Sequence, residues 1–190
     1  MNNRPERLTV AADYFNKSFL PLFAKREDIT AETIIAATAR MAGTTLFRSV
    51  TPPAQSLKPP IVLSEEASVK GPKLTNLMLE TLKPLGHALT EQDLTGANAT
   101  TAASQLTLRE TRQLLDLTVL AHCEATDLPL EDAADALAIS TALFIHDCRA
   151  MLDVRKAAAV AAAGFMEGCK AAPVAVAVST VAPRLALMPA

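Results

Sequence analysis

The stretch TLRETRQLLDLTVLAHCEAT, residues 107–126, is the clearest amphipathic helix in the chain. It opens on a capping box, because the side chain of Thr107 can accept from the backbone of Glu110 while the Glu110 carboxylate reaches back to Thr107. Apolar residues such as Leu115 and Val119 then recur at helical spacing. The stretch therefore predicts a long helix with one side packed against other helices.

Helical spacing also dominates on both sides of this stretch. Apolar residues recur at that spacing over 6–24 and 31–50, and Pro129 begins a further predicted helix that runs, with a bend, past Phe165. Only Val174–Val178 alternates like a strand, and it has no partner strand elsewhere in the sequence. We therefore predict an all-α fold, an irregular bundle of about six to eight helices with an extended C-terminal tail.

The length of 190 residues is enough for one domain with a real core. We predict a single helical domain over residues 1–172 and an extended apolar tail over 173–190. The segment TPPAQSLKPP, residues 51–60, holds two proline pairs and predicts an extended connector. A loop strapped across the domain is the favoured interpretation of this connector, and a proline-rich peptide ligand is the alternative.

Charge and cysteine content narrow the classes of function. The net charge is −2, and no cluster of lysine and arginine resembles a nucleic-acid or lipid footprint, so we predict neither nucleic-acid nor membrane binding. The most apolar stretch, 157–166, is far shorter than the roughly 20 residues that span a bilayer. Three cysteines in helical patterns indicate buried thiols in a reducing compartment, which predicts a cytoplasmic protein.

Three ionisable residues project onto apolar helix faces at the 3.6-residue period. Arg48 continues the stripe of Met41, and Asp147 shares a face with Ser140. His122 points away from the charged arc of its own helix, which comprises Arg109, Arg112, Gln113 and Asp116. Because a buried charge without a partner costs several kcal/mol, we expect Asp147 to pair with Arg48 or with His122.

The cluster of Arg48, His122 and Asp147 allows two interpretations. It could bind a small carboxylate or phosphate ligand, or do acid–base work, in a helical cleft. It could instead be a polar network that fixes helix register. The second interpretation is favoured, because structural ion pairs also lie on apolar faces.

Two further motifs lack the side chains or the geometry that their chemistry needs. Residues 130–149 have the rhythm of a helix-turn-helix, but the second half lacks the side chains that read base edges, so DNA binding is the weakest hypothesis. The neighbours His122 and Cys123 point about 100 degrees apart on a helix, which argues against a shared metal ion. No nucleophile motif or glycine-rich phosphate loop is present. We predict no metal, no cofactor and no catalytic residue.

The alanine-rich run Ala157–Ala163 has a smooth surface that needs close contact with another helix. It packs either inside its own chain or, together with the tail, on a second copy. The first hypothesis is therefore a non-enzymatic interaction protein that acts as a homodimer. Its predicted interface comprises Ala158, Ala162, Phe165, Val174, Val176 and Val178.

Overall fold

The computed structural model describes residues 3–50, 65–95 and 101–170. Within these ranges the chain forms helices and no strand, which confirms the predicted all-α bundle. The elements are α1 (Arg4–Ala24), α2 (Ala31–Val50), α3 (Glu65–Leu82), α4 (Glu91–Thr95), α5 (Leu108–Thr126), α6 (Leu130–Asp147), a 3-10 turn (Cys148–Ala150) and α7 (Val154–Lys170). The predicted connector 51–60 and tail 173–190 lie outside the described residues.

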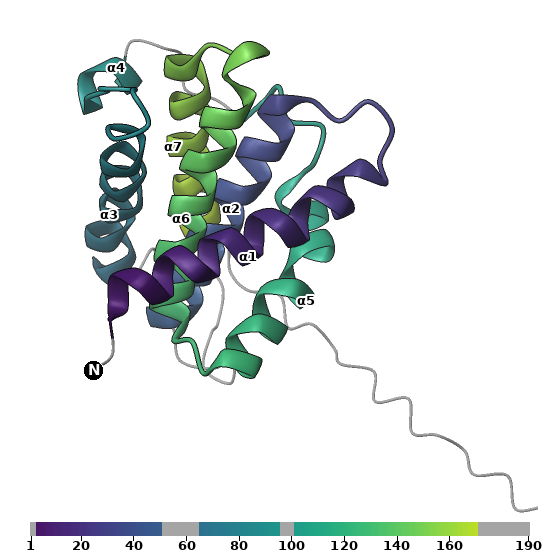
Figure 1. Cartoon of the computed structure of the whole chain (residues 1–190), viewed down its shortest axis with the longest axis vertical. Coiled ribbons are helices and arrows are strands. Elements are labelled where there is room, and N and C mark those ends of the chain that lie inside the picture. The colour runs from purple at the N-terminus through teal and green to yellow at the C-terminus, as the bar shows by residue number, and fades with distance from the viewer. Residues whose placement is uncertain (1–2, 51–64, 96–100, 171–190) are drawn as a thin grey trace, which may run out of the picture.

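Helix α2 lies at the centre of the bundle (Figure 1). It packs most extensively on α7 and α6. Helices α3 and α1 both pack on α6, and α1 crosses α6 (Figure 1). The α1 contact is aromatic, because Phe15, Phe19 and Phe23 recur every four residues and are buried. Phe23 meets Phe144 of α6 edge-on, with ring centroids 6.5 Å apart. Of the long helices α1, α2, α3, α5, α6 and α7, helix α5 packs least on the rest of the bundle, and it leaves much of its surface exposed.

The contact between α2 and α7 is close because glycines lie on both sides of it. A Cβ atom built on Gly43 would lie 2.3 Å from the carbonyl oxygen of Phe165. A Cβ atom built on Gly168 would lie 2.2 Å from the carbonyl oxygen of Arg40. Both distances are far below van der Waals contact, so the two backbones touch directly. In the same helix Ala157, Ala158, Ala159 and Ala161 are at most 1% exposed, so this part of the alanine-rich run packs inside its own chain.

Helix α6 favours a continuous buried helix over the helix-turn-helix alternative for residues 130–149. It is uninterrupted from Leu130 to Asp147, and Ala138, the expected turn position, is fully buried in its middle. A helix that is buried on most sides shows the same apolar rhythm as a helix-turn-helix, which is why the sequence allowed both. The predicted bend lies later, at the 3-10 turn that separates α6 from α7. No helix among the described residues has both the length and the apolar character to cross a membrane.

The three cysteines, Cys123, Cys148 and Cys169, are all free and buried. Cys169 is 1% exposed, and its thiol donates a hydrogen bond to the carbonyl oxygen of Gly43 over 3.6 Å. Burial raises the pKa of the Cys169 thiol to about 11. The thiol is therefore neutral at physiological pH and acts as a small apolar side chain in the α2–α7 contact.

Cys169 is expected to resist thiol reagents in the folded protein at pH 8. Its raised pKa leaves almost no thiolate there, and the reagent has no access to the sulfur. Ellman's reagent should label the thiol only as fast as the chain unfolds, whereas the urea-unfolded chain should react at all three cysteines within the mixing time. Rapid modification of Cys169 in the native protein, located by mass spectrometry, would contradict this burial.

Candidate functional site

Arg48 pairs with Asp116 of α5, and the predicted pairing with Asp147 is wrong. Its two terminal nitrogens lie 2.7 and 2.6 Å from the two carboxylate oxygens, which is a bidentate geometry. The side chains of Arg48 and Asp116 are 14% and 8% exposed. Nε of Arg112 lies 3.6 Å from the same carboxylate, and burial lowers the pKa of Arg112. Two guanidinium groups thus share one buried carboxylate.

The sequence placed Asp116 on the solvated side of its helix, and this assignment was wrong. Arg112 and Asp116 are both buried. Val119 and Cys123 follow them by seven residues each, and both are buried as well. A spacing of seven keeps residues on one helix face, so this spacing was the signal in the sequence from which Asp116 could have been identified as an inward carboxylate.

Asp147 does not take part in any cluster with Arg48 and His122. It is the last residue of α6 and its side chain is exposed. Its backbone is still helical, with φ of −67° and ψ of −36°, so it keeps the face of Ser140, but α6 ends there and the side chain lies beyond the packed part of that face. Among the described residues, no hydrogen bond or ion pair joins any two of the three predicted site residues.

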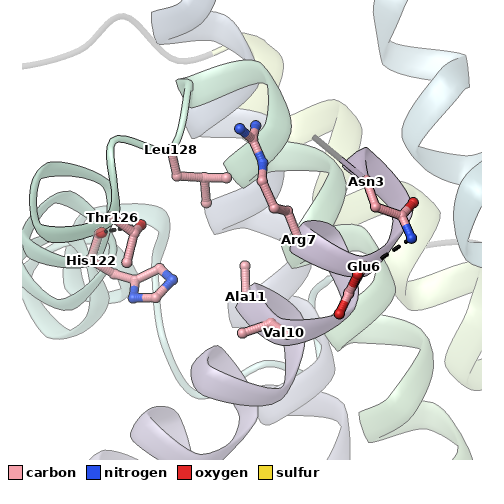
Figure 2. A pocket seen from close by; sticks show the side chains of 8 residues that line it. All are labelled: Asn3, Glu6, Arg7, Val10, Ala11, His122, Thr126 and Leu128. Carbon is pink, nitrogen blue, oxygen red and sulfur yellow. Dashed lines mark hydrogen bonds between the residues drawn. The ribbon is translucent and has the colours of Figure 1, made fainter. Parts of the chain in front are cut away.

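His122 lines a hollow between α1 and the end of α5. Its ring stacks on Tyr14 with centroids 3.9 Å apart, and burial lowers its pKa, which keeps the imidazole neutral at pH 7. Figure 2 shows His122 and Thr126 facing Val10 and Ala11 across the hollow. Its volume is about 340 Å³, and its lining is completed by Asn3, Glu6, Arg7 and Leu128.

The charges around this hollow largely neutralise one another. Nη2 of Arg7 lies 2.6 Å from a carboxylate oxygen of Asp132, and the exposed carboxylate of Glu6 accepts from the amide of Asn3. The hollow therefore lacks the excess positive charge that would attract an anion. Binding of a small anionic ligand stays a prediction, and of its three proposed residues only His122 lines the hollow.

The predicted dimer interface is wrong at two of its six positions. Ala158 and Phe165 are fully buried within the chain's own fold, where α7 packs on α2, so a second copy has no access to them. Ala162 is only partly buried. Val174, Val176 and Val178 lie outside the described residues.

A different surface, along the outer side of α5, leaves apolar side chains exposed. Leu117 is 80% exposed and Leu120 is 39% exposed. They share a helix face with exposed polar residues at spacings of three and four. We call this face the α5 stripe; in order, it comprises Arg109, Gln113, Leu117, Leu120, Glu124 and Asp127. Within the described parts of the chain, its charged members form no ion pair.

The α5 stripe is not among the predicted sites. Arg109 and Gln113 belong to the predicted solvated arc of the helix, and Leu117 and Leu120 belong to no predicted site. The available signal was a large apolar residue, Leu117, between Gln113 and Glu124 at helical spacing.

Comparison of the chain with protein families, with curated proteins and with solved structures found no match.

Proposed function

We propose that this chain works by association, as a homodimer in which α5 of one copy packs antiparallel on α5 of a second copy. The observation that carries the proposal is the α5 stripe, which is apolar in the middle and oppositely charged at its ends. Contiguous apolar side chains on a folded surface, rimmed by polar residues, mark protein–protein contact sites, whereas singly scattered ones do not.

The stripe is complementary to itself in one orientation. In an antiparallel twofold pairing centred between Leu117 and Leu120, Leu117 of each copy packs against Leu120 of the other copy. The same register places Gln113 opposite Glu124, where the amide can donate to the carboxylate. Because the residues recur at intervals of four, three and four, they stay on one seam along the helix.

The charges at the two ends of the stripe favour the antiparallel orientation. Arg109 lies at the N-terminal end and Asp127 at the C-terminal end, both exposed. An antiparallel pair brings each cation near the carboxylate of the other copy, whereas a parallel pair would set Glu124 beside Glu124. The net charge of −2 adds little repulsion between whole copies.

The expected dimer is weak. One helix against one helix buries less surface than the roughly 1,200–2,000 Å² of stable complexes. Burial of the exposed leucine side chains lowers the free energy of association, and the loss of translational freedom raises it. We therefore expect a dissociation constant on the order of 1–100 μM, so the oligomeric state should depend on concentration.

Substitution of Leu117 by glutamate should abolish the dimer. Sedimentation velocity from about 5 to about 500 μM should show the wild type shifting from monomer to dimer and the Leu117→Glu variant staying monomeric. Met151→Glu is the matched control, because Met151 is 74% exposed but lies outside α5. A wild type that stays monomeric throughout, or equal effects of both variants, would overturn the proposal.

Charge variants of Gln113 test the orientation. In the antiparallel register Gln113→Lys gains an ion pair with Glu124 of the second copy and should tighten the dimer severalfold, while Gln113→Glu should weaken it. A parallel pair predicts that both variants weaken association, because each sets like charges side by side. That result would refute the antiparallel arrangement even if the dimer itself exists.

A further inference from the structure

A glycine turn holds His87 in a fixed position after α3. Gly86 has a φ of +92°, which L side chains rarely adopt. The backbone N–H of His87 donates to the carbonyl of Leu82, and that of Gly86 donates to the carbonyl of Lys83, each over 3.0 Å. This is the Schellman pattern that ends helices, and it fixes where the next side chain leaves the backbone.

The ring of His87 meets the ring of His146, which lies in the last turn of α6. Nε2 of His87 is 2.9 Å from Nδ1 of His146, and the ring planes are inclined by 56°. Both side chains are half-buried, so solvent reaches them. Two rigid helix ends thus bring two imidazole nitrogens together at the surface of the bundle.

We propose that His87 and His146 form a binding site for a divalent ion of the copper or nickel class. Two nitrogens that each lie about 2.0–2.1 Å from a metal and subtend 90° at it are about 2.9 Å apart, which fits the square or tetragonal geometry of these ions. A tetrahedral zinc ion needs a separation nearer about 3.4 Å. The present spacing therefore suits a square or tetragonal ion, whereas zinc would require the two nitrogens to move apart.

Replacing the hydrogen bond between the two rings by bonds to a metal ion conserves the number of protons on the pair. In the metal-free pair one neutral ring donates its N–H to the lone pair of the other. When the ion binds both nitrogens, the donor ring moves its proton to its other nitrogen, so no net proton leaves a neutral pair.

The surroundings of the pair fit a weak, open site. The C-terminal end of α6 carries partial negative charge, which favours a cation there. Nη1 of Arg149 donates to the carbonyl of His146 over 2.7 Å, and its positive charge disfavours a bound cation. The exposed carboxylate of Asp147 favours one. The described residues hold no group of three or more metal-ligating side chains, so water would complete the coordination. The expected dissociation constant is on the order of micromolar.

The site is tested by titrating the folded full chain with copper(II), nickel(II) and zinc(II) separately, using calorimetry and, for copper, electron paramagnetic resonance. We expect copper to bind most tightly, with a spectrum typical of two nitrogen ligands, and His87→Ala and His146→Ala each to weaken binding tenfold or more. His122→Ala is the matched control, since His122 stacks on Tyr14 in a different part of the bundle.

Two outcomes would overturn the site. One is copper binding that survives in both His87→Ala and His146→Ala, since other groups would then be the ligands. The other is an equal loss in His122→Ala. Circular dichroism of each variant separates loss of the site from loss of the fold. The Leu117→Glu variant should bind copper as the wild type does, so the test is independent of the proposed dimer.

Discussion

Replacement of Gly168 by alanine is expected to lower the free energy of unfolding by about 3 kcal/mol or more. The new Cβ atom would lie 2.2 Å from the carbonyl oxygen of Arg40 and 2.8 Å from the backbone nitrogen of Thr44. Both are backbone atoms of α2, so no side chain can rotate to make room and the two helices must separate. Alanine gains about 1 kcal/mol of helix propensity over glycine, which offsets only part of this loss.

Urea denaturation followed by circular dichroism measures this effect, and a fall of the midpoint of thermal unfolding by about 6–12 °C should accompany it. Gly43→Ala should behave similarly, because its Cβ atom would meet the carbonyl oxygen of Phe165 across the same contact. Met166→Ala, at a partly exposed position of the same helix, should change stability by no more than about 0.5 kcal/mol. A Gly168→Ala variant as stable as the wild type would show that α2 and α7 do not touch as described.

The helical fold was predictable because local signals agree along most of the chain. The capping box predicted at Thr107 is present, with Glu110 accepting from the Thr107 backbone over 2.8 Å and donating its own N–H to the Thr107 hydroxyl. The partner of the alanine-rich run could not be chosen in the same way. Its packing on α2 depends on Gly43, more than one hundred residues earlier, and periodicity within one helix carries no information about which helix it faces.

The candidate sites were less predictable for a related reason. A helical projection gives the direction of a side chain relative to its own helix, and it therefore found Arg48 and His122 as partly inward residues. It does not give the distance to another helix, so it paired Arg48 with Asp147 when Asp116 was the true partner. The contact between His87 and His146 joins a turn to a helix end, and neither element reveals the other in the sequence.

Substitution of Asp116 by asparagine should destabilise the fold by about 3 kcal/mol, although it changes hardly any volume. The carboxylate accepts two hydrogen bonds from Arg48 and lies 3.6 Å from Nε of Arg112, and all three side chains are largely buried. Removing its charge leaves two guanidinium groups close together in a poorly solvated region. The cost is thus the desolvation and mutual repulsion of the cations that remain, more than the loss of one attraction.

This origin of the effect can be separated from a simple loss of contacts. If the excess of positive charge at this site is the cause, the double variant Arg48→Met with Asp116→Leu should recover most of the stability that Asp116→Asn loses, because it removes one cation together with the anion. The exposed pair of Asp13 and Lys17, 2.6 Å apart, provides the control, and Asp13→Asn should cost less than about 1 kcal/mol. Urea denaturation of the three variants decides the matter. If the double variant is no more stable than Asp116→Asn, the ion pair itself, and not relief of buried charge, holds α2 and α5 together.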